Sequence, residues 1–311
     1  MPGITRQSIY RGPGRLTLGS TVIDNKDGIS LIQEAVTADL GSDLNEFLGS
    51  VQTDQKVKVS LTPYGALSEE LLAALYPAAF RTPATGSSLF GPADVPCTVQ
   101  SAAGVLVTLF SAAVTAPPAL TLSAAATAFG AVEITASLAD GVLPGEDNAL
   151  FKAEASAWSG STAQAVPPTG AKYAAAFGSA AFTETAAGFA AEFQVSTDPV
   201  ASDNAGTVDL TIKGVRASCK FKPLDQSEAA IIALLGLNRA RGSCTASGES
   251  LVVTGTNGLV LTLFNCSVTQ GPLAWGASAL RAGELLFQAS PDPSTGKVFD
   301  IAYSDPAPPT P

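Results

Sequence analysis

Residues 104–110 read Gly-Val-Leu-Val-Thr-Leu-Phe, and residues 258–264 read Gly-Leu-Val-Leu-Thr-Leu-Phe, at an offset of 154. The likeness continues downstream at the same offset, where Val114-Thr115 recurs as Val268-Thr269. Self-similarity of this length indicates a repeated structural unit, and a repeat that goes unnoticed misassigns the whole fold. The chain is therefore predicted to contain two diverged copies of one domain.

Weaker matches on either side keep the same order in both halves. Upstream, Val-Ser-Leu-Thr-Pro at 59–63 resembles Cys-Lys-Phe-Lys-Pro at 219–223, and Gly28 has a counterpart in Gly188, both at an offset of 160. Downstream, the matching pairs are 136–137 with 289–290 and 150–153 with 298–301. Changes in loop length explain the small drifts in offset, whereas scattered low-complexity alanine would not preserve the order.

The stretch between the copies has the composition of a linker. Residues 159–170 read Ser-Gly-Ser-Thr-Ala-Gln-Ala-Val-Pro-Pro-Thr-Gly. Segments rich in Gly, Ser and Pro commonly connect folded units. The predicted organisation is copy one at 1–158, the linker at 159–170 and copy two at 171–311.

Strand patterns dominate both copies. Residues 57–61 alternate between apolar and polar, which is the period-two pattern of a half-buried strand. Residues 105–110 and 259–264 combine alternation with nearly continuous apolar character, so each is expected to be a central strand covered on both faces. A turn glycine, Gly104 or Gly258, precedes each of them.

One helix is expected in each copy. Ser68 can cap a helix that enters through Glu69 and Glu70 and has apolar residues along one side. Ser227 and Glu228 repeat the design in copy two. Elsewhere Gly and Pro separate short apolar runs, so the predicted fold is mainly β. It comprises two tandem copies of an antiparallel β-sandwich or barrel-like domain, each with one flanking α-helix.

The residue composition removes most catalytic chemistry. The chain has no histidine, which excludes the usual general base, the common zinc ligand and Ser-His or Cys-His nucleophile pairs. Its cysteines form no CxxC pair and are expected to be small apolar core residues: Cys97, Cys219, Cys244 and Cys266. The protein is not expected to be an enzyme, and no catalytic, cofactor-binding or metal-binding residue is assigned.

Charge and targeting patterns narrow the class further. The chain has 27 acidic and 17 basic residues, a net charge of −10, which disfavours nucleic-acid binding through phosphates but still allows a path along which DNA slides. Residues 1–15 carry three arginines and no apolar core segment, so no secretory signal is expected. No apolar run reaches transmembrane length.

Four local motifs have ordinary structural interpretations. The sequence Asp-Asn-Lys-Asp-Gly at 24–28 is expected to form a hairpin turn rather than a calcium loop, because a lysine stands where a ligand should be. The sequon at 265–267 lies beside a predicted central strand, and the acids at 145–148 are expected to be solvated. One basic strip could meet a partner's acids or a phosphate backbone: Lys213, Arg216, Lys220 and Lys222.

The order of these elements resembles that of bacteriophage tail tube proteins. The segments that carry the likeness are 57–75 with 104–136 in copy one, and 217–235 with 258–290 in copy two. The resemblance implies sandwich domains that join side by side into rings, whose inner strands form a continuous barrel around a channel for the genome. Such rings are commonly sixfold with one domain per chain, so three duplicated chains would form a pseudo-hexameric trimer.

The same resemblance implies the partners and the location. The rings would stack into a tube, contact tape measure, terminator and baseplate or distal tail proteins at its ends, and surround viral DNA without sequence-specific binding. An acidic lumen is expected to repel the DNA phosphates. The protein would assemble in the host cytoplasm and reside in the virion tail, with no cofactor and no membrane. The alternatives are a tandem β-sandwich surface or receptor-binding module, a capsid decoration or baseplate protein, and an enzyme that uses carboxylates alone.

Overall fold

The chain folds mainly as β-structure, as the sequence predicts. The computed structural model describes residues 14–42, 45–90, 95–137, 150–158, 168–202, 206–225, 248–270, 274–275, 280–281 and 283–304. The described helices are short, α1 (Glu69–Leu75) and α2 (Ala78–Arg81), and the strands pair in antiparallel sheets. Within the described ranges, no helix is long and apolar enough to cross a membrane.

Both halves of the chain contribute short strands and one long hairpin. Residues 14–155 contain β1 (Gly14–Leu18), β2 (Thr21–Ile23), β3 (Asn25–Ser42), β4 (Asn45–Pro63), β5 (Cys97–Ser101), β6 (Val105–Leu109), β7 (Ser111–Ala116), β8 (Leu120–Leu122), β9 (Thr127–Phe129), β10 (Val132–Ser137) and β11 (Phe151–Ala155). Residues 173–303 contain β12 (Tyr173–Phe177), β13 (Ala180–Phe182), β14 (Phe189–Ser202), β15 (Gly206–Phe221), β16 (Leu251–Gly255), β17 (Leu259–Leu263), β18 (Ser267–Gln270), β19 (Ala274–Trp275), β20 (Leu280–Arg281), β21 (Leu285–Gln288) and β22 (Phe299–Tyr303).

The strand order is the same in both halves. The five-stranded sheet β11-β6-β5-β1-β2 of the first half corresponds to β22-β17-β16-β12-β13 of the second. The long-hairpin sheet β3-β4-β10-β7 corresponds in the same way to β14-β15-β21-β18. The terms copy one and copy two are used below for these halves, while the exact domain boundaries and the linker stay predictions.

The strand registers also correspond. Phe151 pairs with Leu109, and their counterparts Phe299 and Leu263 pair with each other. The turn glycines before β6 and β17 have φ of 86° and 85°, a left-handed conformation that favours glycine. The segments that match in sequence therefore occupy the same positions in the two halves.

Strand faces follow the predicted alternation only in part. Val57, Val59 and Leu61 are buried and the residues between them are partly covered, which confirms the half-buried strand. The prediction that β6 and β17 are covered on both faces is wrong. In β6 only Leu109 is buried, and in β17 buried and partly covered residues alternate. An antiparallel sheet can pack one face on the core and leave the other only partly covered, as β17 does, and β6 is only partly covered over most of its length.

The turn expected at 24–28 is a β-bulge instead. The hairpin turn that joins β1 to β2 begins earlier, at Gly19, and the pairing of β3 with β4 shifts between Asn25 and Ile29. The backbone N–H of Gly28 donates to Asn25 Oδ1 at 2.8 Å, and Gly28 has a φ of 96°. A bulge requires the same residue types as a tight turn, because both need a local side-chain acceptor and a left-handed glycine.

The helix predicted in copy one is present. Ser68 caps α1 by accepting a hydrogen bond from the backbone N–H of Leu71 at 3.1 Å, and the leucine side chains of the helix are buried. Helix α2, which the sequence did not predict, begins directly after Pro77. The helix predicted from Ser227 lies outside the described residues, so both described helices belong to copy one.

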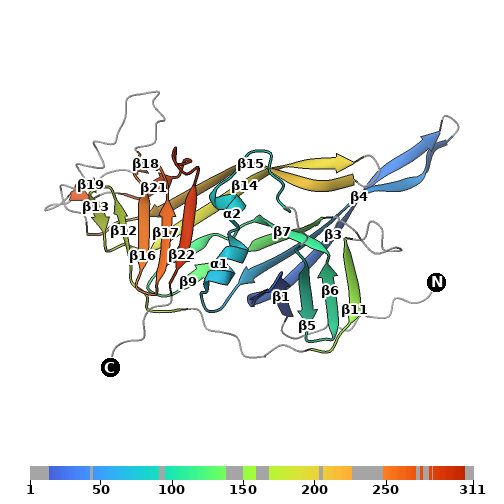
Figure 1. The fold of residues 1–311 in the computed structure, drawn as a ribbon, viewed down its shortest axis with the longest axis horizontal. Helices are drawn as coiled ribbons and strands as arrows, with labels where there is room; N and C mark the ends of the chain where they lie inside the picture. The colour runs from blue at the N-terminus through green and yellow to red at the C-terminus, as the bar shows by residue number, and fades with distance from the viewer. Residues whose placement is uncertain are drawn as a thin grey trace.

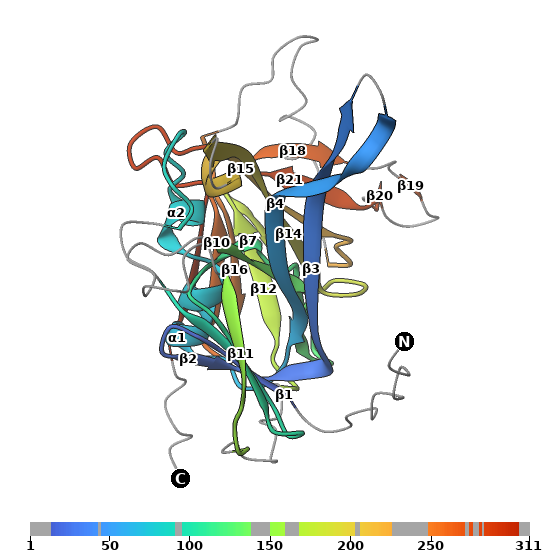
Figure 2. The same cartoon turned by 90° about the vertical axis from the view of Figure 1, so that its right-hand side faces the viewer.

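The two copies share one hydrophobic core. Figures 1 and 2 show the long hairpins β3–β4 and β14–β15 extending toward the same end of the molecule. In Figure 1, α1 and α2 lie between the two five-stranded sheets, and α1 contacts both β2 of copy one and β22 of copy two. The buried residues of both copies form a single cluster, so side chains of one copy complete the packing of the other.

Candidate functional site

A strand of copy one completes a sheet of copy two. β8 pairs antiparallel with β14, with Thr121 opposite Ala190 and Leu122 opposite Phe189. β9 pairs in turn with β8, which gives the sheet order β18-β21-β15-β14-β8-β9. Leu122 is fully buried, and so is Leu120 at the start of β8. The base of the long hairpin of copy two, at residues 189–191 of β14, therefore has its outer edge closed by strand addition from copy one.

A second contact joins α2 of copy one to β22 of copy two. Arg81 donates from Nε to the carbonyl oxygen of Tyr76 at 2.9 Å, and from Nη1 to Asp300 Oδ1 and the carbonyl oxygen of Ile301, both at 3.1 Å. Lys297 Nζ binds Asp300 Oδ2 at 2.8 Å. Partial burial by itself would raise the pKa of Asp300. The hydrogen bonds and positive charges of Lys297 and Arg81 have the larger effect, so the pKa lies below the usual 3.8.

Tyr76 is the apolar centre of the same contact. Its ring lies edge-on to Phe193 at a centroid distance of 5.0 Å and to Phe299 at 6.2 Å. Its hydroxyl donates to the carbonyl oxygen of Pro118 at 2.8 Å, just before β8. Complete burial raises the pKa of Tyr76 well above its usual 10.0, so the phenol stays neutral. One side chain of copy one thus packs against two sheets of copy two.

A polar cluster lies beside β9. Asn257 donates from Nδ2 to the hydroxyl of Tyr173 at 2.8 Å, and that hydroxyl also bonds to Thr127 of β9. Burial raises the pKa of Tyr173, while its hydrogen bonds to Thr127 and Asn257 act in the opposite direction. A buried hydrogen-bond cluster fixes relative orientation, because each misplaced partner would leave another unsatisfied. The cluster therefore fixes the orientation of β9 against Tyr173 and Asn257 of copy two.

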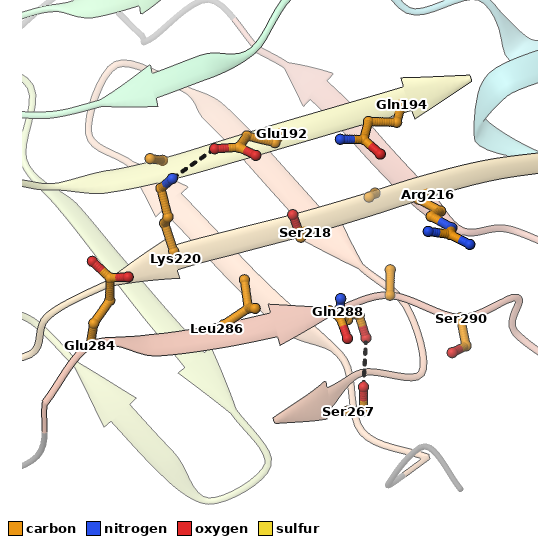
Figure 3. Close-up of a pocket in the computed structure, with 13 residues that line it drawn as sticks. Glu192, Gln194, Arg216, Ser218, Lys220, Ser267, Glu284, Leu286, Gln288 and Ser290 are labelled. Atoms are coloured by element: carbon orange, nitrogen blue, oxygen red, sulfur yellow. Dashed lines mark hydrogen bonds and ion pairs between the residues drawn. The ribbon is translucent and has the colours of Figure 1, made fainter. Parts of the chain in front are cut away.

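The second candidate surface is the polar face of the sheet that contains β14, β15 and β21. Figure 3 shows the hollow on this face, where Lys220 Nζ donates to Glu192 Oε1 at 2.7 Å. This hydrogen bond and the charge of Glu192 raise the pKa of Lys220. The side chains that line the hollow alternate with buried residues such as Phe193 and Phe287. The sheet therefore has one dry face and one polar, solvated face.

The described charges on this polar face are balanced in each copy. In copy two the face carries Glu192, Arg216, Lys220 and Glu284. The same face of copy one carries Glu34 on β3, Lys56 and Lys58 on β4 and Glu133 on β10, of which only Lys56 occupies the position of a charged residue in copy two, Arg216. Each set has two acids and two bases. The described charges on this part of the face therefore show no acidic excess, while the acidic lumen stays a prediction.

The predicted basic strip is interrupted. Arg216 and Lys220 share the polar face, but Lys213 lies at a bulge in the pairing of β14 with β15, and Lys222 lies beyond the end of β15. Lys213 and Lys220 are each ion-paired with an acid of β14, at 3.4 and 2.7 Å. Exposed pairs like these contribute little to stability, but they neutralise the strip as a phosphate-binding surface.

The other sequence motifs are structural or lie outside the described residues. Asn265 Nδ2 donates to the carbonyl oxygen of Pro291 at 3.2 Å, and Cys266 is fully buried, so the sequon forms part of a folded turn. Cys97 and Cys219 are also buried, which confirms them as apolar core residues. The acids at 145–148 and Cys244 lie outside the described residues. Across the described ranges, no group of three or more His, Cys, Asp or Glu side chains could hold a metal ion.

Sequence patterns gave no signal for the residues at the junction of the copies. Arg81, Tyr76 and Tyr173 are single residues without a motif, and each acts through partners in the other copy. No protein-family model matches the sequence, and no curated protein matches it. Function is therefore inferred from the junction and from the polar face.

Proposed function

We propose that this chain is a structural subunit whose copies join side by side into rings, and that the rings stack into a tube like that of a bacteriophage tail. The observation that carries the proposal is the junction between the two copies, where β8 of copy one adds to β14 of copy two. This contact is heterologous, since two different surfaces meet. When a heterologous contact is repeated, each copy is rotated relative to the one before it. The copies close into a ring if a whole number of these rotations makes one full turn.

The two faces of the long-hairpin sheets fit the wall of a channel. One face is dry and packs on the core, whereas the other is polar and presents balanced charges. Such a face offers no excess of positive charge to hold DNA phosphates, so a nucleic acid could pass along it with little retention. Balanced charge replaces net acidity as the physical reason for low friction at these positions.

The remaining parts of the proposal follow from the resemblance to tail tube proteins. Three chains with six copies would form each ring, the tube would lie in the virion tail after assembly in the host cytoplasm, and tape measure, terminator and baseplate proteins would contact its ends. Viral DNA would traverse the lumen without sequence-specific binding, and the chain itself would catalyse no reaction.

Sedimentation velocity over a range of protein concentrations, followed by negative-stain electron microscopy, tests the proposal. Hollow tubes of uniform diameter that lengthen with concentration are expected, because stacked rings form an open-ended polymer. A species that remains monomeric at the highest concentration would contradict the proposal and favour a tandem surface-binding module. Closed rings that never stack would instead favour a baseplate or decoration protein.

A further inference from the structure

Within the described chain, no strand pairs with the outer edge of β3 at the position where the corresponding edge of β14 is closed. β3 is the terminal strand of its sheet within the described chain, whereas β14 lies between β15 and β8. Leu31, on the core-facing side of β3, is 38% exposed, but its counterpart Ala191 on β14 is only 1% exposed. Unpaired strand edges that also expose apolar side chains are sites of strand addition.

The glycines at the two edges report the same difference. A β-carbon added to Gly188 would lie 2.2 Å from the carbonyl oxygen of Leu122, because β8 approaches the backbone there. A β-carbon added to Gly28, the counterpart in copy one, would meet nothing within 4 Å. Both glycines have positive φ, 81° and 96°, so the backbone is alike and the approaching strand is what differs.

A second surface of copy one is open where that of copy two is covered. Phe299 and Ile301 of β22 are buried beneath Tyr76 and Arg81, with exposures of 0% and 2%. Their counterparts on β11 are only partly covered at Phe151 and exposed at residue 153. Copy two therefore receives two covering elements from copy one, and copy one has neither from the described chain.

Copy two contains a counterpart of the strand that closes the edge. β19 and β20 form a two-stranded hairpin between β18 and β21, as β8 and β9 do between β7 and β10. Thr121 pairs with Ala128 in the first hairpin, and Ala274 pairs with Arg281 in the second, at a common offset of 153. Within the described ranges, the second hairpin pairs with no other sheet.

We infer that β19 of one chain pairs with β3 of the next chain, and that this strand addition is the junction between subunits of the ring. Applying the register of β8 on β14 places Ala274 opposite Ser30 and Trp275 opposite Ile29. The occupant of the open edge is thus a second copy of this chain. The inference deepens the proposed function and rests on it, since it names the contact that closes the ring.

Disulfide trapping in the full-length chain tests the register. Directly opposed residues of an antiparallel pair have β-carbons about 5 Å apart, which is within reach of a disulfide after modest adjustment. The variant Ser30→Cys/Ala274→Cys, made with Cys244→Ser and oxidised mildly at assembling concentration, is expected to give a ladder of multimers on non-reducing gels. Mixing the two single variants should give dimers only, because each chain then supplies one half of the contact.

Two matched variants calibrate the result. Thr121→Cys/Ala190→Cys carries the same pair within one chain, so it should form an intrachain disulfide and no ladder. Ser60→Cys/Ala274→Cys places the first cysteine on β4, one strand farther from the proposed contact by about 4.8 Å. This variant should form no disulfide, either within a chain or between chains. One outcome would overturn the proposed register while leaving the proposed function intact. In that outcome rings are visible and the Thr121/Ala190 disulfide forms, but the Ser30/Ala274 disulfide does not. A ladder without any tube would uphold the junction and overturn the proposed function, and monomers without a ladder would overturn both.

Discussion

The backbone at Gly188, directly before β14, lies so close to the carbonyl oxygen of Leu122 that an added β-carbon would be 2.2 Å from it. Gly188→Ala is therefore expected to lower the free energy of unfolding by about 3 kcal/mol, combining left-handed strain with a backbone clash. Gly28→Ala introduces similar strain but no clash within the chain, and should cost about 1–2 kcal/mol. Urea unfolding of both variants measures the difference.

The variants Gly188→Ala and Gly28→Ala also distinguish effects on folding from effects on assembly. Gly28→Ala should fold but fail to form rings, because the incoming strand of the next chain would meet the added β-carbon as β8 would at Gly188. Rings of normal appearance from folded Gly28→Ala would contradict the strand-addition junction. Equal losses of stability in Gly188→Ala and Gly28→Ala would show that the approach of β8 does not matter to the fold.

The Arg81 contact should contribute strongly to stability. Its side chain is 21% exposed and bonds to the carboxylate of Asp300 and to three backbone carbonyls, those of Leu72, Tyr76 and Ile301. Asp300 and Ile301 belong to the other copy. Arg81→Met is expected to cost about 2–3 kcal/mol, since buried acceptors and Asp300 lose a charged donor. Lys152→Met, which removes an exposed ion pair to Glu154, should change stability by less than about 0.5 kcal/mol.

Thermal unfolding of these variants, followed by circular dichroism, makes the comparison. Arg81→Lys is a useful intermediate, because lysine keeps the charge but lacks the planar guanidinium that reaches four acceptors here. A cost for Arg81→Met as small as that for Lys152→Met would mean that the two copies are not held together at this point.

Buried thiols and phenols predict an alkaline loss of stability. Burial raises the pKa of Cys97 to about 12 and of Cys266 to about 11, and it raises the pKa of Tyr76 as well. A group whose pKa is raised by folding stabilises the protein fully below its unfolded pKa, near 9 for the thiols, and that stability is lost as pH rises through the folded pKa. The free energy of unfolding should therefore fall progressively between about pH 9 and 12.

Thiol labelling checks the same burial at neutral pH. Cys97, Cys219 and Cys266 should resist a disulfide reagent at pH 8 in the native protein and react at once in denaturant, because only the exposed thiolate is nucleophilic. Measured with Cys244→Ser, rapid native labelling of more than a small fraction of one thiol would contradict the buried positions of these residues.

The charge balance of the polar face should govern retention of DNA. Glu192→Lys/Glu284→Lys replaces two negative charges by two positive ones and so raises the net charge of this face by four per chain. Because both residues are exposed, each substitution should change stability by no more than about 0.5 kcal/mol. Assemblies of this variant are expected to retain double-stranded DNA at low salt and to release it as salt rises. Glu70→Lys/Glu184→Lys gives the same net charge with exposed residues away from this face. Equal DNA retention by the two variants, measured by filter binding, would exclude the polar face as the lumen wall.

The fold was predictable where a pattern repeats or where local chemistry is specific. The internal match at 104–110 and 258–264 placed equivalent strands in both halves. Ser68 marked the start of a helix, because its side chain can accept a hydrogen bond from a free backbone N–H in the first turn. Gly28 was misassigned because a bulge and a hairpin turn demand the same residue types. The burial of β6 was misjudged because it depends on how many layers cover a sheet, which apolar content does not specify.

The junction between the copies could not be predicted from the sequence. Leu120 and Leu122 show the alternation of a strand, but alternation does not say which edge the strand joins. Arg81 and Tyr76 act through residues more than a hundred positions away, and no local motif marks them. A sequence duplication suggests two self-contained domains. In the structure, however, β8 and β9 of copy one join a sheet of copy two, because a strand edge is costly to leave unpaired.

Rotational averaging of end-on rings in electron micrographs of the unmodified chain tests the central claim most directly. Hollow rings with threefold symmetry and six similar lobes are expected, because each chain supplies two copies joined by one kind of strand addition. Native mass spectrometry counts the chains in each ring, and the number of lobes should be twice that count. A different ratio, or particles without a central channel, would contradict the account.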